Sequence, residues 1–144
     1  MSIPIKKIMV PTDGSVASVT AARWAAALAA SIDASLVLIH VATLGEARVD
    51  AERRASANGG SGPNDVEDAI IKATLTAMGP VSAPVQELHA YGDPVREVVY
   101  QAEHVGADLI VVGNRGLSPI KELLLGSVSD GIARHAKVPV TIVR

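Results

Sequence analysis

The chain has 144 residues, with 13 Lys and Arg against 15 Asp and Glu, which gives a formal net charge of −2 at pH 7. A hydrophobic fraction of 49% excludes a disordered chain, and the near-neutral charge argues against a surface that follows nucleic-acid phosphates. With no Cys, no Phe, one Trp and two Tyr, the sequence also excludes disulfides, thiol catalysis and an aromatic platform for stacking bases.

The length predicts a single domain over residues 1–144, because a chain of this size completes one hydrophobic core. The first fifteen residues lack the apolar core of a signal peptide, since Pro11 and Asp13 interrupt them. No later run approaches the roughly 18 apolar residues that span a bilayer. We therefore expect a cytoplasmic protein with no membrane partner.

Extended apolar runs alternate with segments of helical period, as is typical of βαβ units and a parallel sheet. Strands are expected at residues 7–11, 35–41, 84–90, 107–112 and 138–143. The main helices are expected over residues 16–32, from a cap at Asn64 to Gly79, from a cap at Asp93 to Gly106, and over residues 127–136. This order predicts an α/β fold with a doubly wound, five-stranded parallel sheet.

Two segments carry more specific expectations. In the first helix, spacings of three and four residues predict one buried face, formed by Ala21, Trp24, Ala25, Leu28 and Ile32. Residues 43–63 predict a long mobile loop, because their run of Asn, Gly, Ser and Pro does not suit regular structure.

In doubly wound sheets, ligands bind beyond the carboxyl ends of the strands, where the strand order reverses. After the fourth expected strand the sequence reads Gly113-Asn114-Arg115-Gly116, then nine residues, then Gly126 and a helix. This G-x2-G-x9-G-S pattern suits an anion, because glycine backbone approaches closely and a helix N-terminus offers N–H donors. Ser127 and Ser129 add hydroxyl groups.

An alternative interpretation of the same pattern is purely structural. The glycines would then form only a tight turn, and Ser127 would only cap the helix, with Asp130 completing a capping box. Neither G-x4-G-K-[ST] nor G-x-G-x-x-G occurs in the chain. The missing P-loop lysine favours nucleotide binding with slow or no turnover, and no catalytic residue is assigned.

Four stretches together are specific: KIMVPTDGS at the first strand, LIHV at the end of the second, GDPVREVVYQAEHVGADLIVVGNRG, and LLLGSVSDGIARHAKVPVTIVR at the end. On these the sequence resembles the universal stress protein family, in its ATP-binding branch, over nearly the whole chain. The resemblance implies strand order 3-2-1-4-5, a homodimer through the last strand, and bound ATP. Asn114 is the main departure, since Ser or Thr is frequent there.

The resemblance implies two groups of nucleotide contacts. The phosphate group is Gly113, Arg115, Gly116, Gly126, Ser127, Val128 and Ser129. The nucleoside group is Pro11, Thr12, Asp13 and Val41, with Val41 offering its backbone to adenine. Arg115 either neutralises phosphate charge or is a solvated loop residue.

Asp13 keeps three roles open: it accepts ribose hydroxyls, it binds a metal ion (Mg²⁺ or Mn²⁺) that bridges the phosphates, or it caps the first helix. His40 and His89 are expected at neighbouring strand ends, but no third metal ligand accompanies them. His104 and His135 are expected near helix C-termini, where a cationic side chain suits the helix dipole.

We favour a small cytoplasmic regulatory protein that binds an adenine nucleotide and hydrolyses it slowly or not at all. An unidentified protein partner would recognise its nucleotide-bound state. A nucleotide-free dimeric interaction module and a slow ATPase stay open as alternatives. A phosphoacceptor of the response-regulator type is less suitable, because Asp13 is the only acid directly after the first strand.

The last expected strand also predicts the oligomeric state. Residues 138–143 should lie at a sheet edge, with apolar side chains, no charge to protect them, and Pro139 removing one hydrogen-bond donor. A two-fold contact between two copies would bury both edges. In the alternative, a loop of the same chain covers the edge.

Overall fold

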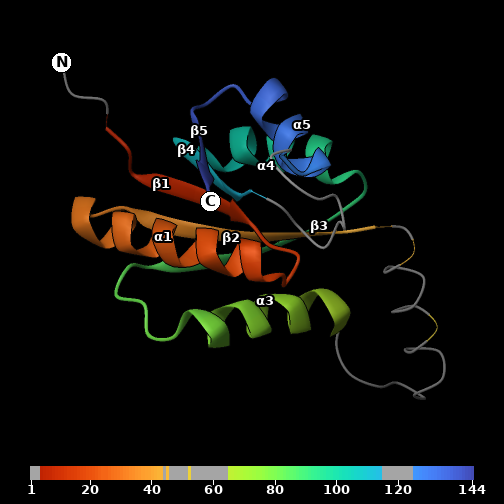
Figure 1. The fold of residues 1–144 in the computed structure, drawn as a ribbon, viewed down its shortest axis with the longest axis horizontal. Helices are drawn as coiled ribbons and strands as arrows, with labels where there is room; N and C mark the ends of the chain where they lie inside the picture. The colour runs from red at the N-terminus through yellow and green to blue at the C-terminus, as the bar shows by residue number, and fades with distance from the viewer. Residues whose placement is uncertain (1–3, 44, 46–51, 53–64, 115–124) are drawn as a thin grey trace.

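The computed structural model describes residues 4–43, 45, 52, 65–114 and 125–144 (Figure 1). The strands are β1 (Lys7–Pro11), β2 (Ser35–Ala42), β3 (Val85–Tyr91), β4 (Leu109–Gly113) and β5 (Val140–Val143). The helices are α1 (Val16–Ile32), α3 (Asp65–Met78), α4 (Pro94–Val105) and α5 (Ser127–His135). The loop expected over residues 43–63, the cap at Asn64, and Arg115 and Gly116 lie largely or wholly outside the described residues.

The five strands form one parallel sheet in the order β3-β2-β1-β4-β5, which confirms the predicted fold class. Helices α1 and α3 cover one face, and α4 and α5 cover the other (Figure 1). Strand β1 pairs with both β2 and β4, so the chain order reverses between β1 and β4. A crevice at the carboxyl ends of these two strands is therefore the expected ligand position.

Strand β1 and helix α1 have the bounds that the sequence predicts, and the other ends differ by at most two residues. Strand β4 begins at Leu109, directly after Asp108, whose carboxylate accepts the backbone N–H groups of Lys6 and Lys7 and whose own N–H donates to the Lys7 carbonyl oxygen. Strand β5 begins at Val140, after Pro139, which has no N–H to donate.

The predicted buried face of α1 is wrong in part. Trp24 is 43% exposed and Ile32 is 37% exposed. The side chains that α1 buries are small: Ser18, Ala21, Ala22, Ala25 and Ala29. Alanine side chains let the helix axis approach the sheet, whereas Trp24 has no room on that side and turns toward solvent.

The starts of α1 and α4 are both capped by side chains, and at α4 the cap is the Asp93 that the sequence predicts. Ser15 caps α1 and accepts the Ser18 N–H, and Asp93 caps α4, with Pro94 in the first turn. Gly106 ends α4 at φ 72°, a backbone conformation that glycine adopts without a steric penalty. These caps fix where α1 and α4 begin, beside the carboxyl ends of the strands.

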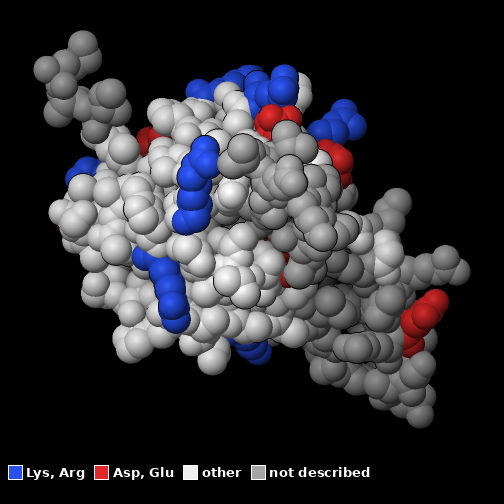
Figure 2. All heavy atoms as spheres, in the orientation of Figure 1, with Lys and Arg blue, Asp and Glu red and all other residues white. Residues whose placement is uncertain are grey.

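The charged side chains on the face shown in Figure 2 are separated by wide uncharged surface, with basic and acidic groups side by side near the top. Two exposed ion pairs among the described residues join Arg134 to Asp130 at 2.8 Å and Lys137 to Glu103 at 3.1 Å. Exposed pairs of this kind contribute little to stability. No helix in the described part of the chain is long and apolar enough to cross a membrane.

Candidate functional site

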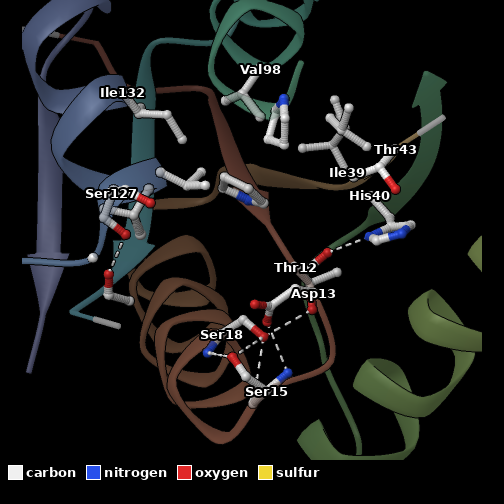
Figure 3. A pocket seen from close by; sticks show the side chains of 18 residues that line it. Thr12, Asp13, Ser15, Ser18, Ile39, His40, Thr43, Val98, Ser127 and Ile132 are labelled. Atoms are coloured by element: carbon white, nitrogen blue, oxygen red, sulfur yellow. Dashed lines mark hydrogen bonds between the residues drawn. The ribbon is translucent and has the colours of Figure 1, made fainter. Parts of the chain in front are cut away.

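A cavity of about 270 Å³ lies at the carboxyl ends of β1, β2 and β4, at the predicted reversal of strand order (Figure 3). Its lining includes every described residue of the two expected contact groups. These are Pro11, Thr12, Asp13, Val41, Gly113, Gly126, Ser127, Val128 and Ser129. The structure thus brings into one cavity residues that are more than one hundred positions apart in the sequence.

One wall of the cavity is apolar, and sequence reasoning did not find it. Val98 and Ile132 project from the α4 and α5 side, opposite Asp13, Ser15 and Ser18 (Figure 3). Pro94, Ile39 and Val112 also line the cavity. Their strand and helix periodicity marks them as core residues, so only the tertiary arrangement shows that they face a hollow.

The N-terminus of α5 borders the cavity without a side-chain cap. Its N-cap is Gly126, in extended conformation at φ −59° and ψ 151°, and Ser127 is the first helical residue. The Asp130 carboxylate pairs with Arg134, 2.8 Å from its Nε. The alternative in which Ser127 and Asp130 form a capping box is therefore wrong. A helix start that lacks a side-chain cap leaves N–H donors and the positive end of the dipole to attract an anion.

Gly113 and Ser129 hold the elements around the cavity together and do not offer side-chain atoms to a ligand. Ser129 Oγ donates to the Gly113 carbonyl oxygen at 2.7 Å, and the Gly126 N–H donates to the Asn114 carbonyl oxygen at 2.9 Å. These two bonds fasten the start of α5 to the end of β4. A Cβ at position 113 would fall 2.7 Å from the Ala17 carbonyl oxygen, so the glycine also lets β4 approach α1.

The loop between β1 and α1 forms the polar wall. The Asp13 carboxylate accepts the Ser15 N–H at 2.9 Å, while Ser15 itself caps α1. The N-cap role for Asp13 is therefore wrong, and its two ligand-binding roles remain. Thr12 borders the cavity, but its hydroxyl is engaged by Ser18 and Thr74.

Comparison with known proteins agrees with this architecture. The model of the universal stress protein family matches residues 4–144. This chain belongs to the universal stress protein family. A member from Mycobacterium tuberculosis, Rv1636, is 35% identical over 140 residues, covering 96% of this chain and 95% of the relative. Another from Methanocaldococcus jannaschii, MJ0531, is 31% identical over 146 residues, covering 96% and 82%.

A solved structure of a universal stress protein in complex with cAMP superposes with a TM-score of 0.73 at 31% identity. The superposition covers 99% of this chain and 98% of that one. The family membership inferred from the sequence is thereby confirmed, and at least one similar universal stress protein binds an adenine nucleotide.

The histidines of this universal stress protein take the positions expected of them. His40 and His89 are register partners on β2 and β3. In the described part of the chain, no group of three or more His, Asp or Glu side chains is placed to hold a metal ion. His104 and His135 lie in the last turns of α4 and α5. His40 also lines the cavity, and its Nδ1 lies 2.8 Å from the Thr12 carbonyl oxygen.

Proposed function

We propose that this universal stress protein binds ATP in the cavity between β1 and β4 and acts as a nucleotide-dependent regulatory protein. The observation that carries the proposal is the meeting of three kinds of surface in one cavity. An uncapped helix start, an apolar wall and a buried polar loop together suit the phosphates, the base and the sugar of a nucleotide. The similar universal stress protein solved with cAMP supports an adenine nucleotide as the ligand class.

The phosphates would lie at the start of α5. The first internal hydrogen bond of the helix runs from the Asp130 N–H to the Gly126 carbonyl oxygen. The backbone N–H groups of residues 127–129 therefore lie ahead of that bond. Such N–H groups bind phosphate oxygens well, because the helix dipole adds to the hydrogen bonds. The exposed Ser127 hydroxyl supplies a further donor at the same place.

The base would lie on the apolar wall of Ile39, Val98 and Ile132, whose side chains are almost completely buried. Placing a flat, weakly polar ring against this wall would remove the apolar surface of the ring from water. The backbone of Val41, at the end of β2, lies within reach of the edge of such a base as part of the same lining. Backbone groups at this edge would select adenine by its hydrogen-bonding pattern.

The ribose would lie against Asp13. Figure 3 shows Asp13 beside the start of α1 and Ser127 beside the start of α5, on separate walls of the cavity. A carboxylate placed apart from the phosphate-binding helix suits sugar hydroxyls, which are hydrogen-bond donors. We therefore assign the ribose role, of the two that remain, to Asp13.

In the other remaining role, Asp13 would bind a Mg²⁺ or Mn²⁺ ion that reaches the site with the phosphates. Asp13 is the acidic residue among the described lining residues, so it is the protein ligand that such an ion would take. A single carboxylate together with phosphate oxygens and waters is a common Mg²⁺ environment. Bound there, the ion would neutralise phosphate charge, and Asp13 would orient it.

Slow or absent hydrolysis follows from the binding groups themselves. The start of α5 supplies backbone donors that hold phosphate in place, whereas a P-loop adds a lysine that neutralises developing charge. The sequence has no P-loop lysine in its glycine motif. We expect kcat for ATP hydrolysis to lie well below about 1 s⁻¹, the lower end of typical enzymes.

Titration calorimetry with ATP and adenosine tests the proposal, using Ser127→Pro and Ser127→Ala. Proline is tolerated at the first helical position, and the extended Gly126 backbone is compatible with a following proline. Ser127→Pro removes a backbone N–H as well as the hydroxyl, and it should weaken ATP binding by about tenfold or more. Ser127→Ala should weaken it less, and adenosine affinity should stay unchanged in both.

Two results would contradict the proposal. One is a wild-type protein that neither releases adenine nucleotide on denaturation nor binds added ATP, which would favour the nucleotide-free interaction module. The other is full ATP affinity in Ser127→Pro with unchanged helicity, which would move the phosphates away from α5.

A further inference from the structure

Thr74 lies on α3, outside the cavity, yet it contacts the loop that carries Asp13. Its side chain is completely buried, and its Oγ1 lies 2.7 Å from Thr12 Oγ1. The same Oγ1 donates to the carbonyl oxygen of Ile70, one turn earlier in α3, at 2.9 Å. A threonine in a helix can satisfy its hydroxyl with that local bond alone. The contact with Thr12 is therefore an additional one, across 62 positions of sequence.

The direction of the hydrogen bond between the two threonines follows from counting protons. Each hydroxyl has one hydrogen to donate and two lone pairs that accept. Because Thr74 donates to Ile70, Thr12 must donate to Thr74. Thr12 Oγ1 then accepts from the Gly14 N–H at 3.1 Å. Ser18 Oγ also lies 3.1 Å from Thr12 Oγ1, but the Ser18 hydroxyl donates its hydrogen to the Ser15 carbonyl oxygen at 2.9 Å. The Thr12 hydroxyl thus donates to α3 and accepts from its own turn, and these two bonds fix the orientation of its side chain.

The backbone of Thr12 is held as well. Its N–H donates to the Ile39 carbonyl oxygen at 2.8 Å, and its carbonyl oxygen is 2.8 Å from His40 Nδ1. Because a carbonyl oxygen only accepts, Nδ1 of His40 carries the hydrogen. Thr12 is thus held by β2 through its backbone, and by Thr74 of α3 and the Gly14 N–H through its side chain.

The orientation of the next side chain, Asp13, depends on these contacts of Thr12. Its Oδ1 accepts the Ser15 N–H at 2.9 Å, so the carboxylate is oriented by a turn that begins at Thr12. Gly14 within that turn has φ 82°, and its N–H is the one bound to Thr12 Oγ1. A displacement of the Thr12 hydroxyl would therefore move both the Gly14 amide and the Asp13 carboxylate.

We propose that Thr74 is a positioning residue that holds Thr12, and through it the Asp13 carboxylate, in the orientation that recognises the ribose hydroxyls of the bound nucleotide. The proposal rests on the proposed function for its ligand. Its structural half, that Thr74 fixes the turn from Thr12 to Ser15, concerns the protein without nucleotide and can be measured separately.

The variant is Thr74→Val, which keeps the branched shape and removes the hydroxyl. Thr20→Val is the matched control, because Thr20 Oγ1 donates to the Val16 carbonyl oxygen at 2.9 Å, the same local bond, on the exposed side of α1. Thr74→Ser restores the hydroxyl without the methyl group. If Thr74→Val does not fold, Thr74→Cys replaces it, because a thiol keeps the volume and forms only weak hydrogen bonds.

The first measurement compares the affinities of ATP and 2′,3′-dideoxy-ATP by calorimetry. Wild type should prefer ATP by about tenfold or more, as expected for hydrogen bonds to a charged group. In Thr74→Val the preference should fall below about twofold through weaker ATP binding, with dideoxy-ATP affinity unchanged. Thr74→Ser and Thr20→Val should keep the wild-type preference. An unchanged preference in Thr74→Val, or an equal loss for both nucleotides, would overturn the positioning role.

The second measurement is amide hydrogen exchange at Gly14 and Ser15 in the nucleotide-free protein. These amides bind Thr12 Oγ1 and Asp13 Oδ1 respectively, so they report the turn directly. Thr74→Val should speed their exchange, whereas Thr20→Val should not. Faster exchange in a protein that binds no nucleotide would refute the proposed function and leave Thr74 as the residue that fixes the turn. Unchanged exchange with normal ATP binding would refute the role of Thr74 and leave the proposed function in place.

Discussion

Gly113, the last residue of β4, lies so close to Ala17 of α1 that a Cβ at position 113 would fall 2.7 Å from the Ala17 carbonyl oxygen and 3.1 Å from its Cβ. Backbone atoms cannot move aside as a flexible side chain can. We predict that Gly113→Ala lowers the free energy of unfolding by about 1–3 kcal/mol, the usual cost of overpacking. Urea unfolding monitored by circular dichroism measures this loss.

Gly45→Ala is the control, because within the described part of the chain a Cβ there would meet only the Thr43 hydroxyl, at an ordinary 3.7 Å. It should change stability by no more than about 0.5 kcal/mol. If Gly113→Ala unfolds at the wild-type urea concentration, the close approach of β4 to α1 is not a constraint. The result also decides how the glycine motif is tested, since lost ATP binding in a Gly113 variant would report packing as well as phosphate contact.

The fold was predictable because its signals are local. Alternating strand and helix periods, and end signals such as Asp93-Pro94 and Gly106, lie within a few residues of the elements that they bound. The position of Gly113 and Gly126 at the crevice was predictable for the same reason, since Gly113 ends a buried strand and Gly126 directly precedes a helix. The predicted bounds of β1 and α1 therefore agree with the structure.

The contacts that shape the cavity were not predictable, because they join residues with no periodic relationship. The hydroxyl contact between Thr12 and Thr74 and the bond from His40 to the Thr12 carbonyl depend on how α3 and β2 lie against the loop. The cap of α1 is a local case that also failed. Asp13 and Ser15 are both capping residue types two positions apart, and only the structure shows that Ser15 accepts the Ser18 N–H.

The buried face of α1 gives a second stability prediction. Ala25 is fully buried against the sheet, whereas Ala27, half a turn away, is exposed. Ala25→Leu should lower the free energy of unfolding by about 1–3 kcal/mol, because the sheet leaves no space for a larger side chain. Ala27→Leu makes the same change in helix propensity, and it should change the free energy of unfolding by no more than about 0.5 kcal/mol. Thermal unfolding that ranks the two variants equally would contradict the alanine-lined contact.

The two remaining roles of Asp13 predict different responses to a divalent cation. Asp13→Asn removes the charge but keeps an oxygen that can accept the Ser15 N–H. If the ribose role is correct, Asp13→Asn should weaken ATP binding by about tenfold both with Mg²⁺ and with EDTA. Calorimetry under both conditions measures this. A loss confined to the Mg²⁺ condition would assign Asp13 to the metal ion instead, and Mn²⁺ should then behave in the same way.

The two edges of the sheet predict where a second copy binds. Strand β3 forms one edge and carries the exposed polar side chains of Gln86 and Glu87, which oppose pairing with another strand. Strand β5 forms the other edge, and its sequence Val-Thr-Ile-Val has no charge. Ile142 on this strand is 38% exposed. We therefore propose a homodimer in which β5 meets its own copy across a two-fold axis.

Ile142→Asp tests the dimer, because a two-fold contact places the two new carboxylates in the same interface, where like charges repel. Sedimentation equilibrium at micromolar concentration should show a dimer for wild type and a shift toward monomer for Ile142→Asp. Val16→Asp is the control, since Val16 is 83% exposed, lies on α1 and gains the same charge. It should stay dimeric. A monomeric wild-type protein would refute the dimer, and the apolar edge of β5 would then need a covering segment from its own chain.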